Sequence, residues 1–93
     1  MVIGVLTVEL FFRGVNSLKD KRKILKSILD KIKARFNVSV AEVDKQDAWQ
    51  FSVIGITFLS NENGHVYQTL ASVARFIEGF PEAEIIRVQT EVF

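Results

Sequence analysis

The amino-acid sequence predicts a ferredoxin-like α+β fold, a βαββαβ two-layer sandwich with a four-stranded antiparallel sheet ordered 4-1-3-2 and two helices on one face. β-branched and aromatic runs alternate with helical repeats of apolar residues in the order strand, helix, strand, strand, helix, strand. The 93 residues are 48% hydrophobic and 25% charged, which suits a globular chain with one modest core. No repeat, linker or low-complexity segment interrupts them, so we expect a single domain over residues 1–93.

The first strand is expected over Val2–Phe12, a β-branched and aromatic stretch in which Gly4 is the only breaker. Its even residues from Leu6 to Phe12 are all apolar and predict the face that packs against the helices. Its odd residues mix apolar side chains with Thr7 and Glu9. They therefore predict the opposite, open face of the sheet.

The first helix is expected over residues 18–36, because Ser17 is a good N-cap and Asp20 three residues later approximates a capping box. An apolar stripe at helical spacing marks its buried side. The stripe consists of Leu18, Leu25, Ile28, Leu29, Ile32 and Phe36. Asn37 and the β-branched residues after it end the helix.

The second half of the chain predicts two further strands, a helix and a last strand. Val38–Val43 and Trp49–Leu59 read as strands, joined through a polar hairpin connection over residues 44–47. The second helix follows the loop over residues 60–64 and ends at Gly79, with Pro81 just beyond. Its buried stripe consists of Val66, Leu70, Val73 and Ile77. The last strand is expected over Ile85–Phe93, with Ile86, Val88 and Val92 on one face.

A two-layer fold leaves the second face of the sheet uncovered. If Ile54, Ile56 and Phe58 of the third strand point inward, the open face is too apolar to remain bare in water. We expect this face to be a homo-oligomer interface. The expected interface residues are Ile3, Val5, Phe11, Trp49, Phe51 and Val53. The alternative is a surface on which RNA bases stack, although the glycine-aromatic signature of RNA-recognition domains is absent from the third strand.

The net charge of +1 conceals an uneven distribution. Residues 13–35 carry nine basic and two acidic side chains, a net +7, and the rest of the chain carries a net −6. On a helix, five of these cations fall within about 100° of one another beside the apolar stripe. They are Lys19, Arg22, Lys23, Lys26 and Lys33. Because the helix dipole disfavours cations near the N-terminus, this flank predicts an anionic partner; the alternative is a lysine-rich surface that only solubilises the protein.

Catalytic and metal chemistry have little support in the sequence. There is no cysteine, and the single histidine, His65, has no obvious partner for catalysis or metal binding. Arg13 and Asn16 before the first helix suit a phosphate, as in acylphosphatases of the same fold, but the longer acylphosphatase signature is absent. Asp44 and Asp47 are explained by turn chemistry. We therefore expect no enzyme activity, no cofactor and no metal.

A cytoplasmic protein without a membrane segment is expected. No apolar run reaches the roughly 18 residues of a membrane span. The first residues carry neither a basic start nor a small-residue cleavage site, so no secretory signal is predicted.

Two blocks of sequence resemble the YlxP-like family of small bacterial proteins. They are Ser-Leu-Lys-Asp-Lys-Arg at residues 17–22 and Arg-Phe-Asn-Val-Ser-Val-Ala-Glu-Val at residues 35–43, followed by Asp47, Trp49 and Gln50. The resemblance covers essentially the whole chain and implies a ferredoxin-like fold. Genes of this family often lie beside translation and ribosome-maturation genes, which implies RNA or the ribosome as a partner. It implies no established activity, cofactor or catalytic residue.

Together these observations predict a non-enzymatic binding protein. It is expected to form a homo-oligomer through its open sheet face and to present the basic flank of its first helix to RNA or the ribosome. A structural or regulatory homo-oligomer with no nucleic-acid role is the first alternative. A phosphate-handling enzyme around Arg13 and Asn16 is the second.

Overall fold

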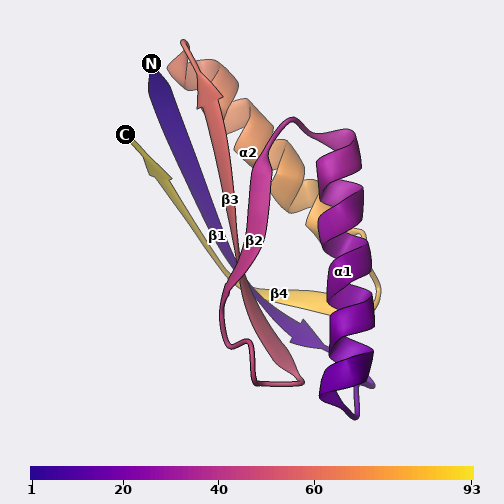
Figure 1. Ribbon diagram of the computed structural model, residues 1–93. Helices are drawn as coiled ribbons and strands as arrows, with labels where there is room; N and C mark the ends of the chain where they lie inside the picture. Colours follow the sequence, from indigo (N-terminus) through magenta and orange to yellow (C-terminus); the bar gives the residue numbers. More distant parts are fainter.

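A computed structural model describes all residues, 1–93, and confirms the predicted topology. The elements follow in the order β1 (Val2–Phe12), α1 (Leu18–Arg35), β2 (Ser39–Asp44), β3 (Phe51–Ser60), α2 (Asn63–Glu78) and β4 (Ala83–Val92). The strands form one antiparallel sheet in the order β2-β3-β1-β4, which is the predicted 4-1-3-2 read from the other edge. The sheet is strongly twisted, and the two chain ends lie near each other (Figure 1).

One hydrophobic core joins the inner face of the sheet to both helices. The even residues from Leu6 to Phe12 of β1 are buried, which confirms the predicted inward face of that strand, and Ile54 and Ile56 show that the even residues of β3, left open by the sequence, also point inward. The sheet and helix residues of this core include Leu6, Val8, Leu10, Phe12, Ile54, Ile56, Leu25, Ile28, Ile32, Val66, Leu70, Val73 and Ile77. The predicted stripe of α2 is buried in full, whereas Leu18, Leu29 and Phe36 of the α1 stripe are half-buried at its margin.

Strand β4 differs from the prediction in its start and in its alternation. It begins at Ala83, and its register against β1 shifts between Glu9 and Leu10. Ile85 pairs with Leu10 and packs against the core, while Ile86 has no partner in the register and is exposed. The predicted alternation from Ile86 to Val92 is therefore interrupted, because the β-bulge inserts one residue and Ile85 rather than Ile86 packs against the core.

The loop between β2 and β3 is longer than the predicted hairpin connection. Strand β3 begins at Phe51, so the prediction that Trp49 opens the strand is wrong. Trp49 lies in the loop with 44% of its surface exposed. Lys45 adopts a left-handed backbone conformation with φ of 59°, and its carbonyl accepts a hydrogen bond from the N–H of Ala48. This turn keeps the following residues out of the strand ladder.

Lys21 of α1 is fully buried, with 0% of its surface exposed. Its Nζ donates to the carbonyls of Lys45 and Ala48, at 2.7 and 2.5 Å, and lies 3.0 Å from Oε2 of Glu42. The same carboxylate accepts a hydrogen bond from the Ser52 hydroxyl. Three oxygen acceptors thus replace the hydration of the ammonium. Lys21 is therefore a structural residue that attaches the β2–β3 loop to α1, and it does not add to the exposed charge of the helix.

Candidate functional site

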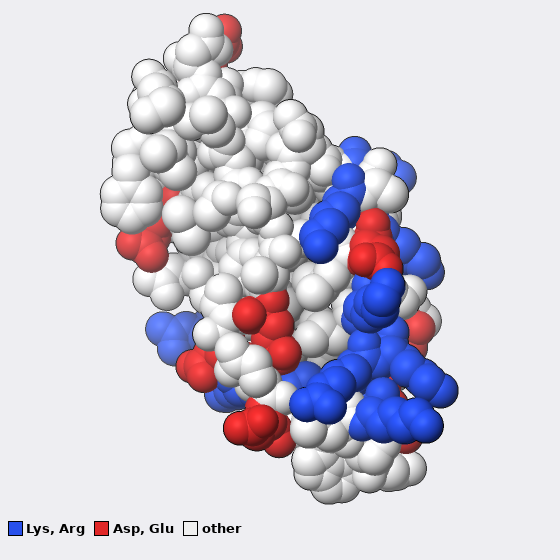
Figure 2. Space-filling view, in the orientation of Figure 1, with Lys and Arg blue, Asp and Glu red and all other residues white.

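The five cations predicted to bind an anionic partner all lie exposed on α1, and we call them the basic ridge. Its members are Lys19, Arg22, Lys23, Lys26 and Lys33. Figure 2 shows Lys and Arg side chains gathered along α1, whereas the upper part of the same view is almost free of charge. At 1.5 Å per residue the ridge is about 21 Å long. Of its members, Lys26 alone forms an ion pair, with Asp30 at 2.7 Å.

The Lys26–Asp30 pair partly neutralises the middle of the ridge. The hydrogen bond from Lys26 holds the pKa of the Asp30 carboxyl below its usual value, and the same bond raises the pKa of Lys26. The two residues are one helical turn apart and exposed, so water and salt screen their attraction. The other four cations of the ridge have no such partner.

The cations on the other flank of α1 are packed against aromatic rings. The Nζ of Lys31 lies 5.6 Å from the ring centroid of Phe80. The guanidinium of Arg35 lies 5.1 Å from the ring centroid of Phe76 and 5.9 Å from that of Phe36. Cation–π contacts of this kind attach the side chains to the α1–α2 boundary. The two flanks of α1 therefore differ, because Lys31 and Arg35 are exposed but lie over aromatic rings, whereas no cation of the basic ridge does.

The open face of the sheet carries an apolar surface that no other element covers. Phe11 faces Phe51 across the β1–β3 ladder, with ring centroids 5.4 Å apart, and Ile3 faces Leu59 in the same ladder. Five of the six predicted interface residues lie on this face: Ile3, Val5, Phe11, Phe51 and Val53. The sixth, Trp49, lies in the loop before β3. Val43 joins the face, because a Cβ on Gly55 would come within 3.1 Å of its side chain.

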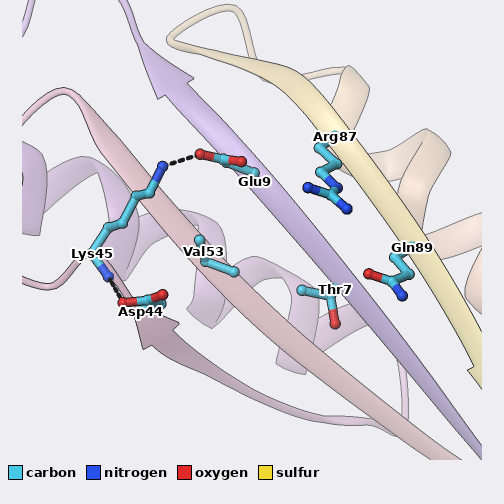
Figure 3. Close-up of a pocket in the computed structure, with 7 residues that line it drawn as sticks. All are labelled: Thr7, Glu9, Asp44, Lys45, Val53, Arg87 and Gln89. Carbon is cyan, nitrogen blue, oxygen red and sulfur yellow. Dashed lines mark hydrogen bonds and ion pairs between the residues drawn. The ribbon is translucent and has the colours of Figure 1, made fainter.

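A polar hollow of about 280 Å³ lies in the middle of this open face. Figure 3 shows its lining residues, which are Thr7, Glu9, Asp44, Lys45, Val53, Arg87 and Gln89. The Lys45 ammonium forms an ion pair with Glu9, and the Lys45 N–H donates to Oδ1 of Asp44 at 2.7 Å. Arg87 reaches in from β4 on the opposite side and forms no ion pair.

Four of these residues form one line across the sheet, which we call the central row. Asp44 pairs with Val53, Val53 with Glu9, and Glu9 with Arg87. A register shift lies beside each end of the row, between Glu42 and Asp44 in β2 and at the bulge in β4. Bulges re-aim side chains and are common next to functional sites. Here they lie beside Asp44 and Arg87, which add a carboxylate and a guanidinium to the polar hollow in the middle of the face.

The other residues considered from the sequence are engaged in local contacts. Arg13 forms an ion pair with Glu84 at 2.9 Å and donates to the carbonyl of Pro81, so its guanidinium is tied to the start of β4. His65 lies 3.1 Å from the Ser60 hydroxyl, and its ring stands edge-on to that of Phe58. Asn16 is exposed in the loop before α1, and Asp44 and Asp47 are separated, because Asp44 belongs to the central row and Asp47 to the loop.

Two further properties of the structure limit the kinds of site it contains. No helix combines the length and the apolar character needed to cross a bilayer. No three histidine, aspartate or glutamate side chains gather in an arrangement that would hold a metal ion.

Comparison with known proteins places the chain in a family. Residues 3–90 match the family described as "Protein of unknown function (DUF503)". The chain belongs to this family. It is 38% identical over 92 residues to "Uncharacterized protein YlxP" of Bacillus subtilis (strain 168), a match that covers 99% of this chain and 100% of that relative. The DUF503 match and this relative confirm the resemblance to the YlxP-like family.

A solved structure supports the fold of this DUF503 chain but not its function. The "De novo designed protein Foldit4" matches with a TM-score of 0.55 at 16% identity, over 100% of this chain and 97% of the designed one. At that identity the match shows a shared fold alone.

Lys45, Arg87 and Gln89 of the hollow are not predicted as site residues by the sequence patterns. The alternation of Arg87, Gln89 and Glu91 with apolar residues does indicate a polar face on the last strand. The position of the bulge has no comparable signal, and the bulge decides that Arg87 rather than Ile86 faces Glu9.

Proposed function

We propose that this protein binds RNA without catalysing a reaction, that it holds the RNA backbone with the basic ridge of α1, and that it works as a homo-oligomer joined through its open sheet face. The observation that carries the RNA proposal is the set of four exposed ridge cations without an ion pair. Three of them, Lys19, Arg22 and Lys23, lie near the start of α1, where the helix dipole disfavours positive charge. A surface kept cationic at that cost suits a polyanion.

The ridge is suited to phosphates rather than to base edges. Its cations are long, exposed side chains on one flank of a helix, with no aromatic ring among them to stack on a base. Binding through about four such contacts gives a slope near −3 for log K against log salt on single-stranded RNA. Strong salt dependence with little sequence preference is therefore the expected signature.

A pair of charge-matched double variants tests this proposal. Lys23→Glu with Lys33→Glu removes two ridge cations, while Lys31→Glu with Arg75→Glu changes the net charge by the same amount outside the ridge. We expect the ridge variant to lose retention of a fluorescent single-stranded RNA at low salt and to show a salt slope shallower by at least 1.4, at about 0.7 per contact. The control variant should keep most of the RNA retention and most of the salt slope. Fluorescence anisotropy measures both quantities.

Two results would contradict the proposal. If both double variants weaken binding equally, net charge rather than the ridge is responsible. If neither changes binding, or the wild-type protein binds no RNA at low salt, the lysines serve only solubility and the structural homo-oligomer remains.

The self-association half of the proposal is supported by the apolar surface around Phe11 and Phe51 that the chain itself leaves uncovered. Light scattering after size exclusion should give about twice the chain mass of 10.6 kDa or more. Phe51→Asp should reduce that mass to one chain. A wild-type monomer that loses RNA on Phe51→Ala would instead make the open face a base-stacking surface.

A further inference from the structure

We infer that two copies of this chain join face to face about a two-fold axis that runs parallel to the strands, so that Arg87 of each copy pairs with Asp44 of the partner subunit. The inference rests on the proposed self-association through the open face and names its geometry. The evidence for this geometry is the arrangement of charges in the central row.

Asp44 and Arg87 are the two charged members of the central row without an ion pair in the single chain. Glu9, between them, is paired with Lys45. Asp44 is on edge strand β2 and Arg87 on edge strand β4, three inter-strand spacings apart. At roughly 4.8 Å per spacing their backbones are about 14 Å apart, too far for the two to pair within one chain.

A second copy brings this carboxylate and this guanidinium together. In a symmetric dimer, contacts occur twice, because each residue meets the partner's equivalent of the other. An axis parallel to the strands places edge strand β2 of one copy over edge strand β4 of the other, in the same row. Asp44 then lies opposite Arg87 of the partner subunit, and Arg87 opposite Asp44 of the partner subunit. Two charge pairs form, and both residues are matched.

The other face-to-face arrangement, with the axis across the strands, matches the charges less well. If that axis passes through the central row, Arg87 faces its own equivalent and like charges meet. If it passes through the neighbouring row of Thr7 and Gln89, Arg87 faces Glu91 of the partner subunit, but Asp44 faces only Ser39 of the partner subunit. An unpaired carboxylate buried between two apolar faces is costly.

The size of the face requires that the central row be covered. The whole molecule measures 43 by 21 by 17 Å, so its open face offers at most about 900 Å², close to the roughly 800 Å² per partner of a standard interface. A stable dimer therefore uses nearly the whole face, including its middle. With the axis along the strands, Phe11 also lies opposite Phe51 of the partner subunit, which extends the aromatic pair already present in each chain.

Charge exchange between two variants tests the geometry. Arg87→Asp places two carboxylates opposite each other, and Asp44→Arg places two guanidinium groups opposite each other. Each variant alone should self-associate about 100-fold more weakly than wild type, the effect of a mismatched charge in an interface. Mixed, they should form a heterodimer of near wild-type affinity, because one native pair of Asp44 with Arg87 remains and the other pair is restored with reversed sign. Native mass spectrometry with one chain tagged measures this, and Arg75→Asp on the helix layer is the control.

The outcomes separate this inference from the proposed function. A wild-type chain that stays monomeric at the highest soluble concentration overturns the self-association proposal, and the pairing with it. A wild-type dimer that both variants leave intact overturns the pairing alone. If Arg87→Asp is rescued by Glu91→Arg and not by Asp44→Arg, the axis runs across the strands and the inference is wrong. Rescue by Asp44→Arg and not by Glu91→Arg supports it.

Discussion

The two faces of the sheet are built from alternate residues of the same strands, yet only one is completed within the chain. On the inner face Leu10 and Ile56 are fully buried against the helices, and the buried charge there, Lys21, has all its acceptors in the same chain. On the open face Phe11 is half-buried and Arg87 has no ion pair. The charge of Lys21 is therefore satisfied inside the chain and contributes to its stability, whereas Arg87 is the charge that a second copy would match under the proposed self-association.

The largest effect is expected from removing the inner charge. Lys21→Met removes the counter-charge of the part-buried Glu42 carboxylate, which keeps only the Ser52 hydroxyl, and one donor from each of two loop carbonyls, so the free energy of unfolding should fall by about 3–5 kcal/mol. Urea denaturation measures it. Lys23→Met, two residues on and exposed, is the control and should change stability by no more than about 0.5 kcal/mol. Equal stability of the two variants would mean that Lys21 does not hold the β2–β3 loop.

Adjacent residues of β1 compare the two faces directly. Leu10→Ala should reduce the free energy of unfolding by about 2–5 kcal/mol, because it opens a cavity in the core. Phe11→Ala removes a larger side chain but should cost the dilute monomer clearly less, and should instead weaken self-association. Thermal unfolding at low concentration and light scattering at high concentration separate these effects. A larger stability loss for Phe11→Ala in the monomer would show that the open face is completed within the chain.

Two glycines of the central strands give a finer version of the same comparison. A Cβ on Gly4 would overlap the side chains of Val66 and Leu70 on the inner side, so Gly4→Ala should cost about 1–3 kcal/mol. A Cβ on Gly55 would meet only Val43, at 3.1 Å on the open face. Gly55→Ala should therefore cost less than about 1 kcal/mol. Equal losses in the unfolding free energy would mean that Val43 is held as rigidly as the core.

The sequence predicts the inner face better than the open one, for a physical reason. The even residues of β1 and the stripe of α2 repeat at the periods of a strand and a helix, so their burial follows from local pattern alone. The basic ridge follows in the same way from helical spacing. Lys21 also lies on the buried side of its helix, one turn before Leu25, but its acceptors are loop carbonyls 24 and 27 residues away.

The positions of the central-row residues depend on register shifts, which leave no periodic pattern in the sequence. Its two ends are set by register shifts in β2 and β4, and a one-residue shift moves a side chain to the other face. Trp49 shows the same limit, because the turn at Lys45 removes it from a strand that its β-propensity favours. Side chains whose positions depend on tertiary contacts therefore cannot be placed from local sequence patterns.

The smallest expected effect is on RNA affinity, and it concerns Lys26, the one cation of the basic ridge that forms an ion pair. Asp30→Asn releases Lys26, so single-stranded RNA should bind somewhat more tightly, with a salt slope steeper by about 0.7. Ser27→Asn, on the same helix without an ion pair, is the control. Unchanged affinity and slope in Asp30→Asn would mean that Lys26 does not touch the RNA.

The Lys26–Asp30 pair also determines how the attraction between these two side chains depends on pH. Because Lys26 lowers the pKa of Asp30, the attraction contributes above the unfolded value of 3.8 and is lost as pH falls through the lower folded value. Because Asp30 raises the pKa of Lys26, the attraction is lost on the alkaline side as pH rises through a value above 10.5. Between about pH 5 and 9 both groups stay charged, so the gain from Asp30→Asn should be constant there. A gain that varies within this range would come from a titrating group other than Lys26 and Asp30.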